Sequence, residues 1–133
     1  MSMLTRFLLY GALGCLMEVF WTGLASLRRK DFKLSARTSI WMFFIYGLAV
    51  FLEPVFRLLH GFPLVFRGAF YAGCIFLVEY VTGHLLNFAK IRPWDYNGCR
   101  FNLQGVIRLD YAPAWFVAGL IFERVYVTIM QLL

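Results

Sequence analysis

Four glutamates are the residues best placed to do chemistry in this chain, because each lies inside a different long apolar stretch. The three aspartates lie between those stretches. An ionised carboxylate at the centre of a bilayer costs about 2.5–3.5 kcal/mol on insertion scales, so such residues are rare and mark functional sites. The glutamates are Glu18, Glu53, Glu79 and Glu123, and the aspartates are Asp31, Asp95 and Asp110.

The apolar stretches that must position these carboxylates are long enough to be membrane-spanning helices. They cover residues 4–27, 38–56, 68–88 and 111–133, each near the ~20 residues that cross ~30 Å of hydrocarbon. Of the 133 residues, 62% are hydrophobic and only 15% are charged, which excludes an ordinary soluble domain. No Gly-x4-Gly-Lys-Ser/Thr phosphate loop occurs. We predict an all-α integral membrane protein in which residues 1–133 form a single four-helix transmembrane domain.

The basic residues predict an orientation. The loops 28–37 and 89–110 hold nine lysines and arginines, whereas only Arg6, Arg57 and Arg67 fall on the opposite side, with Arg124 inside the fourth span. The positive-inside rule therefore places both basic loops in the cytoplasm and both termini on the other side. The formal net charge of +6 reflects these loops, so we expect no nucleic-acid partner.

A weak internal similarity suggests two parallel two-helix repeats. Gly14-Cys15 and Glu18 in the first span resemble Gly73-Cys74 and Glu79 in the third. Each half would contain two spans, so the halves would run in the same direction. Small residues share a helical face with the glutamates, which predicts that the carboxylates turn inward. Counting from the span midpoints places Glu18, Glu79 and Glu123 in one band near the midplane, with Glu53 nearer the outer surface beside Pro54.

Several side chains could neutralise this acidic band. One intramembrane arginine, Arg124, cannot balance four carboxylates, so some are protonated or a ligand is bound. Three interpretations remain open: protonated packing contacts, a cation or proton pathway, and a site for a polar organic group or lipid headgroup. A dinuclear metal site needs Glu-x-x-His, whereas His84 is five residues after Glu79, so we expect no metal and no cofactor. Further candidate partners are His84, Thr22, Thr82, Tyr46, Tyr71 and Tyr126.

The loop before the fourth span carries the most distinctive motif. It contains Trp94-Asp95-Tyr96, then Phe101-Asn102 and Gly105. Its aromatic, amide and charged side chains suit a loop folded onto the membrane interface, with Asp95 capping a turn. A role as an aromatic anchor and a role in gating or ligand binding are both open.

These motifs resemble the transmembrane protein 229 family, within the type IV ABC-transporter (CmpB-like permease) family. The resemblance rests on Gly14-Cys15-x-x-Glu18, Phe44-Ile45-Tyr46-Gly47, Glu79-x-x-Thr82-Gly83 and the Trp94 to Leu109 block, and it covers residues 5–127. It implies a small multi-pass membrane protein with no settled substrate; any transporter ATPase would be a separate chain. Bacterial members often have a double tryptophan where this chain has Pro93-Trp94. The functional residues that the resemblance implies are Glu18, Glu79, Thr82, Trp94, Asp95, Tyr96, Asn102 and Gly105.

These observations favour a membrane protein whose acidic site binds or transports a cation or small polar solute. One alternative is a non-transporting accessory or scaffold protein. A second is an interfacial lipid-modifying enzyme using Asp95, Asn102 and a glutamate, although no Ser-His-Asp arrangement or metal motif supports catalysis. The expected partners are membrane lipids and further copies of the chain. The candidate ligand-binding residues are Glu18, Glu53, Glu79, Glu123 and Thr82.

Overall fold

The computed structural model describes residues 2–132 and is mainly helical. Four of its helical segments are long and apolar enough to cross a membrane. They are Met3–Arg29, Ile40–Leu58, Leu64–Phe88 and Leu109–Leu132. The predicted all-α membrane architecture is thus confirmed, with the third span beginning four residues earlier than the sequence suggested. The chain divides into two compact units, Met1–Leu52 and Glu53–Leu133.

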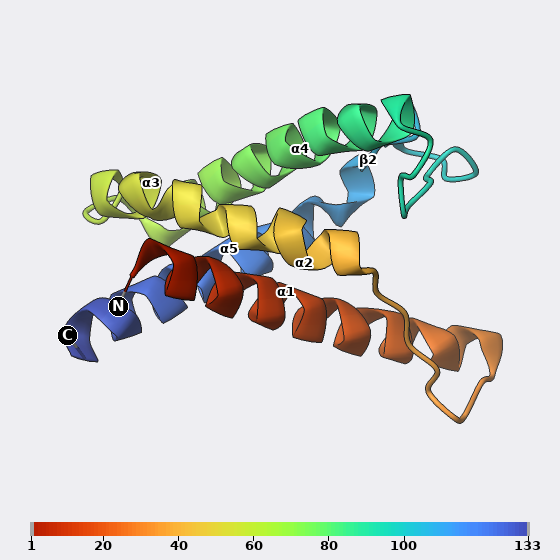
Figure 1. Ribbon diagram of the computed structural model, residues 1–133, viewed down its shortest axis with the longest axis horizontal. Coiled ribbons are helices and arrows are strands. Elements are labelled where there is room, and N and C mark those ends of the chain that lie inside the picture. The colour runs from red at the N-terminus through yellow and green to blue at the C-terminus, as the bar shows by residue number, and fades with distance from the viewer. Residues whose placement is uncertain (1, 133) are drawn as a thin grey trace. The chain divides into compact units, whose positions relative to one another are not determined.

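The first unit is an antiparallel helix pair (Figure 1). Helix α1 spans Met3–Ser26 and continues into a short 3-10 helix, η1, at Leu27–Arg29; α2 spans Ile40–Gly47 and is followed by the 3-10 helix η2, Leu48–Leu52. Serines cap the starts of both helices: Ser2 accepts from the Thr5 amide and Ser39 from the Trp41 amide.

Glycines let α1 and α2 approach closely. A methyl group at Gly14 would lie 2.1 Å from Cγ of Tyr46, and one at Gly47 would lie 2.8 Å from the Phe7 ring. Both distances are shorter than the contacts that Cβ atoms make in proteins, so an alanine at either position would force the neighbouring ring to move. This confirms for the first unit that small residues form the helix interface, as is common in membranes.

The second predicted span is not one uninterrupted α-helix. The 3-10 segment η2 separates α2 from α3, which spans Glu53–Leu58. Pro54 explains the break, because it has no N–H for the carbonyl of Val50 and its ring would clash with that carbonyl. A tighter 3-10 turn just before the proline avoids this conflict.

The second unit contains α3 and a second antiparallel pair, α4 at Leu64–Phe88 and α5 at Ala112–Leu132. A methyl group at Gly68 would lie 2.3 Å from the Phe116 ring, and one at Gly119 would lie 2.4 Å from Cβ of Tyr71. Each helix of the pair therefore supplies a glycine that receives an aromatic side chain of the other.

The connection between α4 and α5 is folded. Strands β1, Asn102–Leu103, and β2, Ile107–Arg108, pair antiparallel, and the 3-10 helix η3, Leu109–Tyr111, leads into α5. Val106 at the turn is fully buried, and its Cβ would lie 2.9 Å from a methyl group placed on Gly83 of α4. The hairpin is therefore packed onto α4 through Val106.

Candidate functional site

An ion pair between α4 and α5 is the centre of the candidate site. Nε of Arg67 lies 3.1 Å from Oε2 of Glu123, and the two side chains are only 20% and 16% exposed. The same guanidinium donates from Nη1 to the carbonyl of Phe62, at 2.7 Å. Because Pro63 precedes the helix and α4 begins at Leu64, Arg67 lies in its first turn rather than outside the span.

A tyrosine completes the cluster. The hydroxyl of Tyr71 donates a close hydrogen bond to Oε2 of Glu123, and the Tyr71 side chain is fully buried. Arg67 and Tyr71 are four residues apart, so both project from the same face of α4. The Glu123 carboxylate thus receives one charged and one neutral donor from a single helix face.

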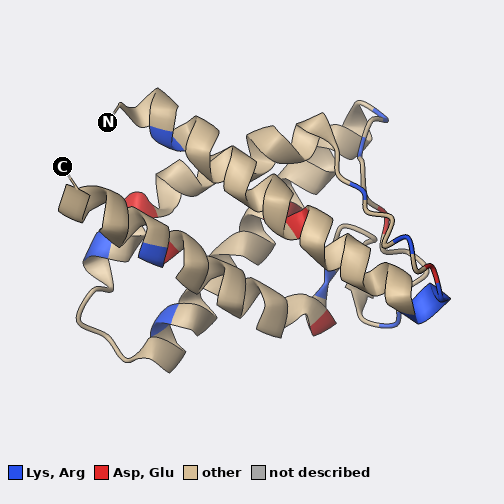
Figure 2. Cartoon of the chain, turned by 90° about the horizontal axis from the view of Figure 1, so that it is seen from below, with Lys and Arg blue, Asp and Glu red and all other residues tan. Residues whose placement is uncertain are grey.

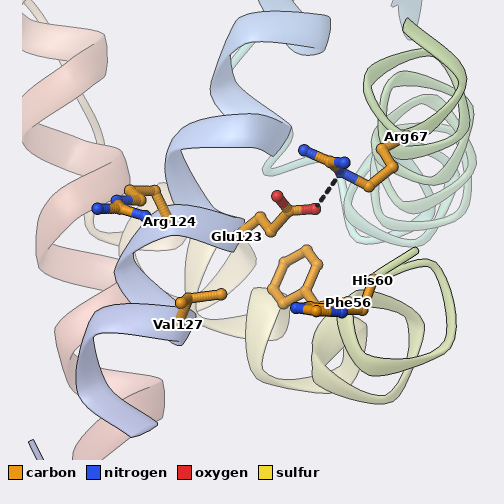
Figure 3. Close-up of a pocket in the computed structure, with 6 residues that line it drawn as sticks. All are labelled: Phe56, His60, Arg67, Glu123, Arg124 and Val127. Carbon is orange, nitrogen blue, oxygen red and sulfur yellow. Dashed lines mark hydrogen bonds and ion pairs between the residues drawn. The ribbon is translucent and has the colours of Figure 1, made fainter. Parts of the chain in front are cut away.

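A cavity of about 250 Å³ adjoins this cluster. Figure 3 shows the Glu123 carboxylate pointing toward Arg67, whereas the Arg124 guanidinium points to the opposite side in this view. The two arginines and one glutamate leave one formal positive charge on the cavity wall. The lining residues are Phe56, His60, Arg67, Glu123, Arg124 and Val127.

Aromatic packing supports the floor of the cavity. Phe56 of α3 is buried, with its ring centroid 5.1 Å from that of Tyr71 and 5.6 Å from that of Tyr126. The Tyr126 hydroxyl accepts a hydrogen bond from Nη1 of Arg57 at 2.9 Å. This contact joins α3 to α5.

The prediction that Glu79 and Glu123 lie in one band near the membrane midplane is wrong. Glu79 is buried on α4 but lies twelve residues beyond Arg67, which corresponds to about 18 Å along the helix. Glu123 lies beside Arg67, so the two carboxylates do not share one site. The depth count assumed that the spans are centred at one level, whereas α5 is displaced along α4.

The other predicted polar residues have local contacts. Glu18, half-buried in the first unit, accepts a hydrogen bond on Oε2 from Thr38 at 3.2 Å. Glu53 is buried at the start of α3. The Thr82 hydroxyl donates within its own helix to the carbonyl of Val78, at 2.7 Å, a pattern that needs no ligand.

The first part of the loop motif stabilises the loop itself. Trp94 donates from Nε1 to the carbonyl of Val106 at 3.0 Å, which ties the motif to the buried hairpin turn. Oδ1 of Asp95 accepts from the amide of Asn97 at 2.9 Å, so the predicted turn-capping role of Asp95 is confirmed. The amide of Tyr96 bonds to the carbonyl of Gly105.

The second part of the motif closes the hairpin. Asn102 accepts from the Gly105 amide at 3.0 Å and donates to the carbonyl of Cys99 at 2.6 Å. Gly105 has φ +74°, and a methyl group there would lie 2.5 Å from Oδ1 of Asn97. These contacts account for both the asparagine and the glycine through loop geometry.

Sequence reasoning missed Arg67. It placed the residue in a loop because the third span was expected to begin at Gly68. The apolar run Leu64–Phe66 directly after Pro63 is the signal that would have extended the helix, because proline is favoured at helix starts. Tyr71 was among the hydroxyl partners considered, whereas Arg124, the expected intramembrane cation, forms no ion pair in the described part of the chain.

Within residues 2–132, no group of three or more histidine, cysteine, aspartate or glutamate side chains is arranged to hold a metal ion. No solved structure matches the chain. The profile of the family described as Putative ABC-transporter type IV matches residues 5–133, nearly the whole sequence. Together with four membrane-spanning helices, this match shows that the chain is a multi-pass membrane protein that belongs to the Putative ABC-transporter type IV family.

Proposed function

We propose that this chain is a permease-type membrane component that binds or transports a small polar solute at the cavity beside Arg67 and Glu123. The main support for this proposal is the mostly buried ion pair that borders a cavity between membrane-spanning helices. Intramembrane charged residues are costly and usually line a ligand or ion pathway. The family's transporter description supports the same interpretation.

The charge on the cavity wall favours a solute with an anionic group over a bare cation. Glu123 is the one carboxylate in the lining, and it already receives donors from Arg67 and Tyr71. Arg67 retains N–H groups that make no hydrogen bond to the described residues, and the His60 ring also lines the cavity. These groups match phosphate or carboxylate oxygens better than a metal cation.

The volume of the cavity restricts the size of that solute. Pockets for drug-sized ligands enclose roughly 300–1,000 Å³. A cavity of about 250 Å³ therefore suits a group no larger than a short phosphate ester or a small organic acid.

Within the family, we place the chain in the transmembrane protein 229 branch. The support is the sequence Pro93-Trp94-Asp95-Tyr96, followed by Phe101-Asn102-x-x-Gly105.

A packing role is the second candidate, and one observation favours it. Arg67, Tyr71 and Glu123 form a closed network in which the carboxylate has two donors, an arrangement that also fastens α4 to α5. In that case the protein would be a non-transporting accessory or scaffold. The lipid-enzyme alternative is less favoured, because Asp95 and Asn102 are engaged in loop hydrogen bonds.

Ligand-induced stabilisation separates these functions. We would measure the melting temperature of the full-length chain in an uncharged detergent with glycerol 3-phosphate, inorganic phosphate, potassium chloride or calcium chloride at equal ionic strength. We expect the two phosphates to raise the melting temperature and the two chlorides to have no effect, because a ligand that binds the folded state stabilises it.

Two variants locate the effect. Arg124→Gln removes a positive charge from the cavity wall, and Arg100→Gln removes one from the loop, where Arg100 contacts the Phe101 ring. The phosphate effect should weaken in the first variant and persist in the second. An equal response in both variants, or no response to any solute, would support the packing role instead.

A further inference from the structure

We propose that residues 28–37, the basic loop, bind the anionic phospholipid headgroups of the adjacent leaflet. Figure 2 shows the basic residues gathered along this connection between α1 and α2. The proposal concerns the first unit and is independent of the solute-binding cavity. It assigns the loop a lipid preference beyond its use in setting membrane orientation.

The basic loop has a high positive charge that would attract anionic headgroups. Five of its ten residues are basic and one is acidic, which gives a formal charge of +4. All five basic residues are exposed. The carboxylate of Asp31 accepts a hydrogen bond from the backbone amide of Lys33 and forms no ion pair with the residues that the structure describes. The basic residues are Arg28, Arg29, Lys30, Lys33 and Arg37.

The backbone of the loop is folded back onto the end of α1. The amide of Arg37 donates to the Thr22 hydroxyl at 2.9 Å, and the Ser26 hydroxyl donates a close hydrogen bond to the carbonyl of Ser35. Both contacts are made by residues inside α1. The loop therefore has a defined shape, so less conformational entropy is lost when headgroups bind.

The loop also exposes apolar groups beside its charges. Phe32 is 80% exposed and Leu34 is 46% exposed. A combination of basic side chains with an exposed aromatic ring is suited to the membrane interface, where the ring enters the headgroup region and the cations contact phosphates. Neither feature is explained by packing within the unit.

The other predicted cytoplasmic loop provides a contrast. In residues 89–110, Arg108 lies 2.8 Å from Asp110, and Arg92 lies 3.4 Å from Asp95. The hydrogen bond to Asp110 also raises the pKa of Arg108 above its ordinary value. Internal pairing thus neutralises two of the four basic side chains of that loop. We therefore assign the lipid preference to the basic loop rather than to both loops.

The test compares the affinities of the full-length chain for short-chain phosphatidylglycerol and short-chain phosphatidylcholine. Native mass spectrometry in an uncharged detergent gives both dissociation constants. Each basic residue near an anionic surface strengthens binding by about five-fold. We expect Arg28→Gln with Lys33→Gln to lower the preference for phosphatidylglycerol by about 25-fold. Neither side chain makes a hydrogen bond in the described part of the chain, so the fold should persist, as the melting temperature will check.

The matched control removes two charges from the other loop, Lys90→Gln with Arg100→Gln, and should keep the wild-type preference. Raising the salt concentration from 0.1 M to 1 M shortens the screening length from about 10 Å to about 3 Å and should abolish the preference of the wild-type chain. Phe32→Ser should weaken the binding of both lipids alike. The proposal is overturned if the basic-loop variant keeps its preference, or if the control loses as much.

Discussion

Breaking the Arg67–Glu123 pair from either side should destabilise the second unit, and breaking both sides should cost less than the two losses together. Two unit charges 3.1 Å apart attract by about 5 kcal/mol at an effective dielectric constant of about 20. Desolvation offsets much of this attraction, whereas an unpaired partner left behind has no such compensation. We expect Arg67→Met and Glu123→Leu each to lower the free energy of unfolding by about 3 kcal/mol.

The double variant tests whether the two charges stabilise each other, because it leaves neither charge unpaired. We expect it to lose about 4 kcal/mol rather than about 6, which is a coupling energy of about 2 kcal/mol. The assay is reversible unfolding in mixed micelles with rising dodecyl sulfate, followed by circular dichroism. Arg124→Met is the control, since Arg124 forms no ion pair in the described residues. Additive losses in the double variant would refute the reasoning.

Two pairs of glycine substitutions test the close contacts of Gly14 and Gly105 by the same unfolding assay. Gly14→Ala should lower the free energy of unfolding by about 1–3 kcal/mol, because its methyl group would overlap the Tyr46 ring, whereas Gly73→Ala, with nothing within 4 Å, should be neutral or stabilising. Gly105→Ala should lower the free energy of unfolding by about 1–2 kcal/mol because Gly105 has a positive φ and a crowded site, whereas Gly98→Ala should have little effect. Equal losses of stability within either pair of variants would contradict the contact that the pair tests.

The helical architecture was predictable because membrane spans are long and apolar, so composition alone identifies them. The turn role of Asp95 was also predictable, since aspartate commonly bonds the amide two residues ahead. The interruption of the second span before Pro54 was not predicted, because the position of a proline does not specify the 3-10 geometry that accommodates its missing N–H. The single-domain organisation, the sidedness and the oligomeric state stay predictions.

The candidate site was less predictable, because it depends on how α5 is displaced along α4. A hydropathy pattern gives the length of each span but not the offset between two spans. Arg67 and Glu123 are 56 residues apart in sequence, and no local spacing connects them. Glu79, near the middle of its helix, was expected at the same depth as Glu123 and lies about three turns away instead.

The predicted parallel repeat gains support at the loops rather than at the helix faces. The equivalent glycines differ, since Gly14 packs against Tyr46 whereas Gly73 has open space. Helix α1, with its 3-10 continuation η1, and helix α4 nevertheless end in the same way. Lys30 and Lys90 both have positive φ, near 60°, and both lie in a Schellman motif with matching hydrogen bonds. A lysine in the left-handed conformation is unusual. Its occurrence near the start of loops 28–37 and 89–110 therefore supports duplication more strongly than the small residues that two apolar helices share.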